Sequence, residues 1–385
     1  MNDMLCTRRQ AIRAMGGIAA GFGLSSVGFL FSRQAPSAPV AVGVSRTYGP
    51  EVLPTLGTMF DQLGGLEKLV RGKTVAIKLN LTGSTSDQLG NLPLEMTHWV
   101  HPQVIGSTLH LLDRAGARRI RLLESPWSTA EPLEEFMRQA HWDPRDFQGA
   151  AARVEFENTN YLGNGKKYSR FMVPGGGLMF QGYDLNHAYQ DCDVFVSLAK
   201  LKEHATAGVT LTTKNCFGIT PCTIYGEGAG KDEPSLLPKG GRGLIHDGHR
   251  LASSSAPPLV NPHCSKYPGF RVPRVSADLV AARPVHLAII DGIQTIKGGE
   301  GPWVSGCKPV HPGLLIAGRN CVSTDAVATA LMGFDPMADR GTAPFERCDS
   351  TLRLAEKLGV GTRNLAQIET LGASIPKVRF NFRAA

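Results

Sequence analysis

Closely spaced cysteine pairs are missing from this sequence. Its 385 residues include eight cysteines, and no two of them form a C-x-x-C pair. Ferredoxin-type iron–sulfur clusters are held by cysteines at such spacings, so no cluster of that type is expected. With Cys6 set aside in a distinct N-terminal segment, the remaining seven are an odd number and cannot all pair within one chain. We therefore expect mostly buried free thiols, with one or two disulfides left open.

Runs of lysine and arginine interleaved with aromatic residues are also absent. Aromatic residues make up 7% of the chain, and the formal net charge is +8 at pH 7. Nucleic-acid-binding domains carry a more concentrated basic surface, so no nucleic-acid partner is expected. By contrast, 42% of the residues are hydrophobic and 19% are charged, which is ordinary for a folded protein and argues against disorder of the bulk.

The first 34 residues have the composition of a targeting segment. Arg8 and Arg9 precede a stretch, 14–32, that has no charged residue and is rich in Gly, Ser and Ala. This pattern resembles a twin-arginine export signal and implies a periplasmic or cell-envelope protein, exported in the folded state by the twin-arginine machinery. An uncleaved membrane anchor is the alternative, and membrane contact is expected only in that case.

Apolar strands alternate with amphipathic helices in the rest of the chain. A strand at 73–80 is followed by a helix that starts near Pro102 and by a strand at 118–123, which together form a β-α-β unit. The pattern predicts an α/β fold with a mainly parallel central sheet flanked by helices, either as one body or as two lobes with a cleft. The predicted α/β domain covers 40–340, and a C-terminal helical extension covers 341–385.

Two segments of this domain have no clear periodicity. Residues 149–184 are interpreted as an irregular or β-rich insertion, and residues 223–273 as a long loop rich in Gly, Pro and Ser. A helix is expected from Pro273 to Ala282, with Asp278 on its polar side.

The stretch 191–219 combines a predicted buried strand with a group of charged residues, and the site prediction starts from it. It opens with an apolar, β-branched run at 194–196, as buried parallel strands require. The run is followed by the polar residues Lys200, Lys202, His204, Lys214 and Asn215. Several cations in so short a segment, among apolar neighbours, suggest an anionic or metal partner.

Polar side chains also end other predicted strands. Lys78 and Asn80 end one strand, Glu124 ends the next, and Asp291 ends a third, while Glu300 lies in a Gly-Pro turn further on. Because the carboxyl ends of parallel strands meet at one edge of a sheet, we expect these side chains to converge. The predicted ligand-binding residues are Lys78, Asn80, Glu124, Asn215, Asp291 and Glu300.

Catalytic chemistry is assigned to His204, Lys214 and Lys202. A lysine whose pKa is lowered by its neighbours acts as a base or a covalent anchor, and otherwise binds a carboxylate or phosphate. His204 is suited to carry a proton or to bind a metal. The alternatives left open are a surface position for Lys202 and, for Lys214, an ion pair inside the fold with Asp291 or Glu300.

Two further histidines extend this set. His246 and His249 are three residues apart in the long loop and can share a metal ion with His204. The alternative is a solvated histidine pair.

Five ordered motifs resemble DUF362, a family defined by sequence without a settled function. They lie between about Val75 and Pro336 and read KLNL (78–81), LKEH (201–204), TLTTKNCFG (210–218), DGI with EGP (291–293 and 300–302), and TDAVA with MGFDP (324–328 and 332–336). The resemblance implies an α/β fold and leaves the chemistry open.

A more distant similarity links His204, Gly208, Thr210 and Lys214 to the nickel-pincer lactate racemases. In that family the lysine carries a covalently attached pyridinium-derived cofactor and the histidine lies at the metal site. This chain differs from the racemase pattern at Thr212-Thr213, where those enzymes have two glycines, and at Leu123-Glu124-Ser125-Pro126, where they have a Gly-x-His turn.

The sequence therefore predicts an exported DUF362-type protein, interpreted as an enzyme that uses a metal or a lysine-linked cofactor at a Lys/His site. The alternatives are a non-catalytic envelope protein that binds a small anionic ligand or a metal, and a redox accessory protein.

Overall fold

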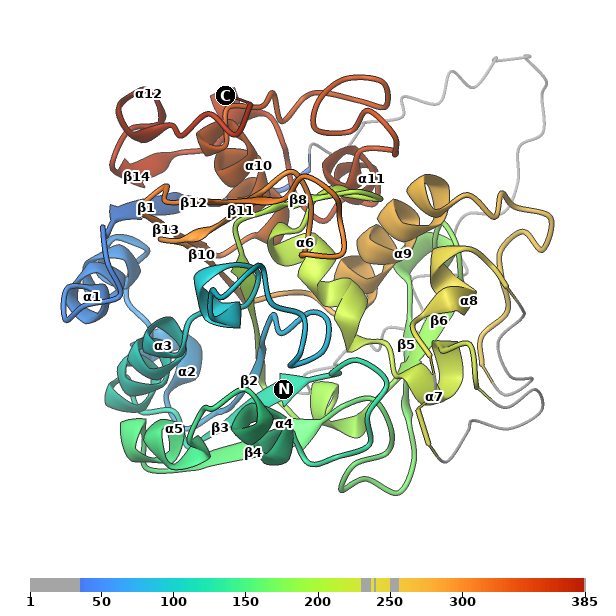
Figure 1. Cartoon of the computed structure of the whole chain (residues 1–385), viewed down its shortest axis with the longest axis horizontal. Coiled ribbons are helices and arrows are strands. Elements are labelled where there is room, and N and C mark those ends of the chain that lie inside the picture. The colour runs from blue at the N-terminus through green and yellow to red at the C-terminus, as the bar shows by residue number, and fades with distance from the viewer. Residues whose placement is uncertain (1–34, 230–236, 239, 250–255, 384–385) are drawn as a thin grey trace, which may run out of the picture. The chain divides into compact units, whose positions relative to one another are not determined.

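An eight-stranded sheet lies at the centre of the computed structural model, which describes residues 35–229, 237–238, 240–249 and 256–383 (Figure 1). The strand order is β14-β1-β13-β10-β7-β2-β3-β4. The expected export signal, residues 1–34 with Cys6, lies outside the described residues.

The central sheet is mainly parallel. Its strands are β1 (Val40–Val44), β2 (Thr74–Lys78), β3 (Arg119–Glu124), β4 (Val154–Asn158), β7 (Val194–Lys200), β10 (Leu287–Gly292), β13 (Leu314–Gly318) and β14 (Thr370–Gly372). Strand β13 runs antiparallel to both neighbours, β1 and β10, and the other neighbouring pairs are parallel. The predicted α/β class with a mainly parallel sheet is confirmed.

Alternate residues of the inner strands face two separate hydrophobic cores. In β7, Val194, Val196 and Leu198 pack into one core, whereas Phe195 and Ala199 pack into the other. A strand that is buried on both faces has to be apolar along its whole length, which explains the continuous apolar run in this sequence.

Helices cover both faces of the sheet (Figure 1). One core includes residues of α1 (Val52–Gln62), α2 (Glu67–Val70), α3 (Pro102–Arg114), α4 (Leu133–Gln139) and α5 (Pro144–Ala150). The other includes residues of α6 (Leu211–Asn215), α7 (Cys222–Tyr225), α8 (Gly243–His246), α9 (Pro268–Ala282), α10 (Cys321–Leu331), α11 (Thr351–Lys357) and α12 (Ile375–Val378).

Helix α3 shows how the local sequence sets an element. His101 is the N-cap, and its Nδ1 accepts the N–H of Gln103 at 3.0 Å, while Pro102 occupies the first helical position, where no N–H is needed. Ile105, Leu109 and Leu112 are spaced for one helix face and are all buried. The predicted start of this helix is confirmed.

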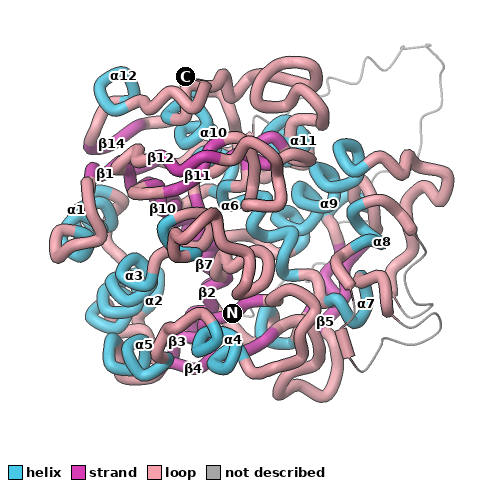
Figure 2. Tube along the Cα trace, in the orientation of Figure 1, coloured by secondary structure: helices cyan, strands magenta, loops and turns pink. Residues whose placement is uncertain are grey.

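Smaller elements complete the fold, and Figure 2 shows long loops between them. The short hairpins are β5 (Ser169–Met172) with β6 (Gly182–Leu185), β8 (Glu203–His204) with β9 (Gly208–Val209), and β11 (Thr295–Lys297) with β12 (Lys308–Val310). The 3₁₀ turns are η1 (Leu94–Met96), η2 (Pro174–Gly176), η3 (His187–Tyr189), η4 (Cys216–Ile219) and η5 (Leu365–Gln367).

The structure corrects the expected organisation at several places. The segment 149–184 contains the strands β4 and β5, as its β-rich interpretation expected, but β4 belongs to the edge of the central sheet rather than to an insertion. The C-terminal segment 341–385 is not purely helical, since β14 pairs with β1 at the opposite edge. The described residues form one compact unit, so the alternative of two lobes is not observed.

Helix α9 also differs from its prediction. It starts at Pro268, five residues earlier than expected, and contains Pro273 in its interior. Asp278 is buried rather than on a polar face, and it accepts hydrogen bonds from the N–H groups of Leu178 and Met179 at 2.6 and 2.8 Å. Its role is therefore to hold a loop against the helix.

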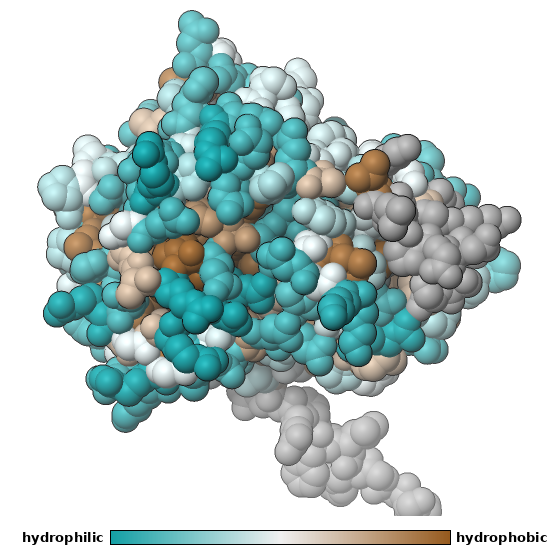
Figure 3. Space-filling model, turned by 90° about the horizontal axis from the view of Figure 1, so that it is seen from below, coloured by the Kyte–Doolittle hydropathy of each residue, from teal (hydrophilic) through white to brown (hydrophobic). Residues whose placement is uncertain are grey.

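The surface and the helices of the described part bear on the expectations for a membrane-associated chain. On the face that Figure 3 shows, hydrophobic residues form small groups surrounded by hydrophilic ones. Among the described helices, none combines the length and the hydropathy that crossing a membrane would require.

The seven cysteines outside the N-terminal segment are all free thiols. The alternative of one or two disulfides is therefore not observed.

Candidate functional site

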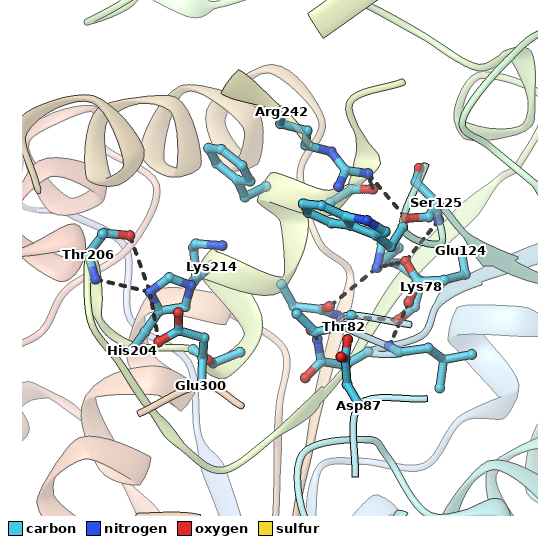
Figure 4. A pocket seen from close by; sticks show the side chains of 18 of the residues that line it. Lys78, Thr82, Asp87, Glu124, Ser125, His204, Thr206, Lys214, Arg242 and Glu300 are labelled. Atoms are coloured by element: carbon cyan, nitrogen blue, oxygen red, sulfur yellow. Dashed lines mark hydrogen bonds and ion pairs between the residues drawn. The ribbon is translucent and has the colours of Figure 1, made fainter. Parts of the chain in front are cut away.

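A cavity of about 520 Å³ lies at the carboxyl ends of β2 and β3, between these strands and α6 (Figure 4). Ligands bind at this edge in open α/β sheets. The lining residues are Lys78, Asn80, Leu81, Thr82, Gly83, Ser84, Asp87, Glu124, Ser125, Trp127, His204, Thr206, Thr210, Lys214, Asn215, Phe217, Gly218, Arg242, His246, Glu300 and Trp303. Most of the predicted site residues are thus brought together.

One wall of the cavity contains a buried ion pair. Lys78 ends β2 and Glu124 ends β3, and the Nζ atom of Lys78 lies 2.5 Å from Oε1 of Glu124. The carboxylate also accepts the N–H groups of Leu81 and Ser125, both at 2.8 Å. Burial lowers the pKa of Lys78, and the attraction of Glu124 opposes that shift. The charges of the two side chains compensate each other, so neither is available to neutralise a ligand.

Two asparagines fix the same wall. The Nδ2 atom of Asn215 donates to Ser197 Oγ at 3.1 Å, and its Oδ1 lies 3.4 Å from the Nζ of Lys78. The Nδ2 of Asn80 donates to Thr82 Oγ1 at 3.0 Å. Because these amides already have protein partners, they hold the wall in place as well as facing the cavity.

Helix α6 is anchored from the neighbouring helix α10. The two carboxylate oxygens of the buried Asp325 accept the N–H groups of Thr212 at 2.9 Å and Thr213 at 2.8 Å. Asp325 therefore caps the start of α6, whereas the N-cap of α10 itself is Asn320. This anchor fixes the direction in which α6 presents Lys214.

Lys214 has no ion pair. In the part of the chain that the structure describes, its Nζ has no hydrogen-bond or salt-bridge partner, and it lies 4.3 Å from the centre of the Phe217 ring. Neither Asp291 nor Glu300 pairs with it, so the expected ion-pair alternative is wrong. Burial lowers the pKa of Lys214 to about 7, with Glu300 opposing and Arg242 assisting that shift. A substantial fraction of this amine is therefore neutral near pH 7.

His204 lies in the same cavity and is also neutral. Burial lowers the pKa of His204 to about 3, although Glu300 acts in the opposite direction. Its Nδ1 accepts the N–H of Thr206 at 3.2 Å and lies 3.8 Å from Oε2 of Glu300. Since Nδ1 is an acceptor, the proton of the neutral ring is on Nε2, which makes this nitrogen a donor.

Glu300 stays ionised beside His204. Its Oε2 accepts the N–H of Ala205 at 2.8 Å, and its Oε1 accepts the indole N–H of Trp303 at 3.2 Å. Burial alone raises the pKa of this carboxyl, but these donors and the neighbouring His204 lower it to about 2. In Figure 4, Glu300, His204, Thr206 and Lys214 form one group, across from Lys78, Glu124 and Ser125.

Arg242 and His246 come from the long segment in which only the histidine was predicted. Arg242 Nε donates to Thr220 O at 2.9 Å and its Nη2 to Ser125 O at 3.2 Å, so its charge meets carbonyl groups rather than a carboxylate. Burial lowers the pKa of His246 to about 4. No periodic pattern in the sequence points to Arg242, because it precedes a helix of only four residues.

Three predicted residues do not line the cavity. The Nζ of Lys202 is buried and donates to the carbonyl oxygens of His98 and Glu300 at 2.8 and 2.9 Å. Burial lowers the pKa of Lys202 to about 7. Asp291 pairs instead with Lys200, at 2.9 Å, inside the sheet. His249 is exposed and hydrogen-bonds to Asp247. Lys202 is thus neither at the surface nor in the site.

The three histidines predicted as metal ligands are not assembled for that purpose. His204 and His246 line the cavity, but His249 does not. Within the described residues there is no group of three or more His, Cys, Asp or Glu side chains arranged to hold a metal ion. The structure therefore gives no protein-only ligand set for a metal. The unpaired amine of Lys214 and the space beside it do fit a lysine-linked group.

Two tryptophans were missed entirely. Trp127 and Trp303 line the cavity from loops, and both are largely exposed. A signal for them exists in the sequence, because each is a large aromatic residue in a segment without strand or helix periodicity.

The fold and the cavity define an α/β protein with a cavity at the carboxyl edge of its sheet. The chain belongs to the DUF362 family, described as a domain of unknown function, whose model matches residues 75–330. It is also 23% identical over 303 residues to the thylakoid-associated protein sll1697 of Synechocystis sp., a match that covers 77% of this chain and 74% of that protein.

Two solved structures show partial likeness. One is a protein from Thermotoga maritima, with a TM-score of 0.35 and 14% identity over 68% of this chain and 53% of that one. The other is the lactate racemase apoprotein from Thermoanaerobacterium thermosaccharolyticum, with a TM-score of 0.32 and 10% identity over 71% and 54%. The chain thus spans about half the length of these two proteins.

Proposed function

We propose that this protein is an enzyme in which the amine of Lys214 forms a covalent bond with the carbonyl carbon of an organic anion. The observation that carries this proposal is the position of the Lys214 Nζ atom. It faces a cavity of about 520 Å³ and has no ion-pair partner among the described residues. Lysines that form Schiff bases have such surroundings, because a charged and paired ammonium is not nucleophilic.

Two lining cations support an anionic ligand, even though the carboxyl groups of Asp87 and Glu300 also line the cavity. Lys214 and Arg242 line the cavity, and neither has a carboxylate partner within the described residues. Lys78 differs from both because Glu124 neutralises it. A ligand carboxylate or phosphate held by Arg242 would supply the missing negative charge and leave the neutral amine of Lys214 free to react, and hydrogen bonds to charged groups are the strong ones.

The proposed step balances without an external oxidant or reductant. The neutral amine of Lys214 attacks the carbonyl carbon, a C–N bond forms, and the oxygen leaves as water once it has taken up protons, which leaves an imine. His204 would donate a hydrogen bond from Nε2 to the carbonyl oxygen, and the N–H of Thr206, bonded to Nδ1, orients the ring. A neutral imidazole polarises a carbonyl without the desolvation cost of an imidazolium.

The bonded group can be a substrate or a permanent cofactor. In the second case Lys214 would carry the group, which would supply an electron-accepting ring, as the resemblance to the nickel-pincer racemases implies. His204 and Arg242 would face it from the same cavity. The metal that this resemblance implies remains part of the proposal, with His204 and His246 as the cavity-lining histidines that would hold it.

The proposal includes export. The Arg8-Arg9 segment would direct the folded protein through the twin-arginine machinery to the periplasm or cell envelope. Export after folding would allow a cofactor to be attached before the protein leaves the cytoplasm.

The test is intact-protein mass spectrometry of the full chain purified from its native host, with elemental analysis. A mass increment on Lys214 in the untreated protein identifies a permanent cofactor. An increment that appears only after incubation with a 2-oxo acid and borohydride identifies a substrate imine. Peptide mapping provides the matched control, because Lys202 has a similar pKa but lies outside the cavity and should stay unmodified. If neither treatment labels Lys214, the proposal fails and a non-catalytic anion-binding protein takes its place.

A further inference from the structure

The four tryptophans of the chain fall into two classes. Trp99 and Trp142 are buried and pack against each other, with 5.6 Å between their rings. Trp127 and Trp303 are 53% and 47% exposed, and both line the cavity. An indole that faces a cavity exposes a large apolar face to water, and covering that face with an apolar partner is favourable.

Trp303 is held in place on three sides. A Cβ atom built on Gly83 would lie 2.7 Å from its Cζ3 atom, and one built on Gly301 would also collide with the ring. The indole N–H donates to Glu300 at 3.2 Å, and the ring of His98 meets it edge-on with 5.5 Å between centres. Two glycines thus leave room for the ring, and its orientation is fixed before any ligand arrives.

Trp127 has a similar support. It follows the end of β3, and a Cβ atom on Gly241 would lie 2.7 Å from its Cη2 atom. Gly241 immediately precedes Arg242, so the segment that supports this ring also supplies a cation to the cavity. An aromatic face and a positive charge are therefore presented together.

The polar part of the cavity has an unused donor. The hydroxyl of Thr210 is buried and has no hydrogen-bond partner among the described residues, although it lines the cavity. Buried hydroxyl groups are normally bonded, so an orphan of this kind indicates a missing ligand atom or water. With Lys214 and Arg242 it forms a set suited to an anionic head group.

From these observations we propose that the cavity binds an anion that carries a planar conjugated ring, with the ring against Trp127 and Trp303 and the anionic group near Lys214, Arg242 and Thr210. This ligand class deepens the proposed function. It rests on that function only in assuming that the ligand and the reactive Lys214 share one cavity. The cavity volume, about 520 Å³, is within the range of roughly 300–1,000 Å³ of small-molecule sites. Aromatic rings stack on indoles in preference to saturated rings of the same size.

The test uses three matched probes: 2-naphthoate, its saturated analogue decahydro-2-naphthoate, and the neutral 2-naphthamide. Isothermal titration calorimetry of the purified full chain should show 2-naphthoate binding about tenfold more tightly than each of the other two. Equal binding of the flat and saturated anions would overturn the stacking assignment. Equal binding of acid and amide would overturn the anionic one, and failure of all three to bind would overturn both.

Variants locate the ring. Trp303→Phe should keep part of the preference for the flat anion, whereas Trp303→Ala and Trp127→Ala should each lower the affinity for 2-naphthoate about tenfold and leave decahydro-2-naphthoate nearly unchanged. Tyr267→Ala is the control, because Tyr267 is an exposed aromatic residue, at 43%, that does not line the cavity. An equal loss in the Tyr267→Ala variant would count against the proposal.

The outcomes separate the two proposals. A Lys214 adduct without any preference for flat rings would retain the proposed function and remove the ligand class. A preference for 2-naphthoate that depends on Trp127 and Trp303, without any Lys214 adduct, would retain the ligand class and remove the covalent step.

Discussion

Lys78 and Glu124 join the ends of two neighbouring strands through an ion pair of 2.5 Å, with both side chains buried. The pair removes one cation and one anion from the electrostatics of the cavity. Lys214 and Arg242 are left as the lining cations without a carboxylate partner among the described residues, opposite the ionised Glu300. The charges that a ligand would meet are therefore those of the residues without a salt-bridge partner, because the Lys78 and Glu124 charges cancel each other.

Breaking this pair should cost stability. Glu124→Ala leaves the buried Lys78 charge unpaired and frees the N–H groups of Leu81 and Ser125, so we expect a loss of about 3–5 kcal/mol in the free energy of unfolding. Urea denaturation measures it. The double variant Lys78→Met/Glu124→Leu should lose less, because no charge remains buried. A single variant as stable as the wild type would show that the pair is open to water.

The Lys200–Asp291 pair should contribute to the stability of the fold but not to ligand binding. Both side chains are fully buried, and Asp291 also accepts the hydroxyl of Tyr48 at 2.9 Å and the N–H of His101 at 3.0 Å. Asp291→Ala should therefore destabilise the fold by about 3–5 kcal/mol. Since Asp291 does not line the cavity, the affinity of the folded variant for 2-naphthoate should stay within about twofold. A large loss of affinity in folded protein would place Asp291 in the site after all.

The part of the site that could be predicted from the sequence is the part formed by the carboxyl ends of neighbouring parallel strands. Lys78 and Glu124 end neighbouring parallel strands, and such ends meet at one edge, so their convergence follows from the chain alone. Asp291 ends a parallel strand too, but its partner depends on the register of β7 and β10, which places it opposite Lys200. Register is set by packing across the whole sheet and cannot be read from one strand.

Residues outside regular elements were harder to predict. Arg242 and Trp127 reach the cavity from loops whose path depends on distant contacts, such as the bond from Arg242 to Thr220. The β-rich interpretation of 149–184 allows for strand β4, but its place at the edge of the central sheet depends on pairing with β3, which contacts distant in the chain decide. Asp278 was assigned to solvent because carboxylates are rarely buried, and the N–H groups that stabilise it lie about 100 positions earlier.

His204 should be a neutral imidazole with its proton on Nε2. Its pKa of about 3 keeps it uncharged throughout the neutral range, and its Nδ1 accepts the N–H of Thr206. Long-range ¹H–¹⁵N NMR on histidine-labelled protein should show this tautomer, unchanged between about pH 5 and pH 8. His204→Gln identifies the signal. His249 is the internal comparison, because its hydrogen bond with Asp247 raises its pKa. A His204 signal that titrates near pH 6.5 would contradict the assigned burial.

The charge of Lys214 should make stability depend on pH in a defined direction. The folded protein releases this proton near pH 7, because burial lowers the pKa of Lys214, whereas the unfolded chain holds it up to about pH 10.4. Between these values the unfolded state binds more protons, so the contribution of Lys214 to the free energy of unfolding becomes more favourable as the pH rises. Below pH 7 the full penalty for burying the charge is present.

Lys214→Met lacks this group and provides the reference curve. The variant should be more stable than the wild type at pH 6, and the difference should shrink steadily as the pH rises towards about 10, as measured by urea denaturation across that range. Lys202 has a similar pKa and is present in both proteins, and because the charge of Lys214 helps to lower that pKa, the difference between the curves also contains this coupling. Parallel curves for the two proteins would mean that Lys214 keeps its proton in the folded state. The amine would then be a fixed cation for the anionic ligand, and the covalent step would lose its nucleophile.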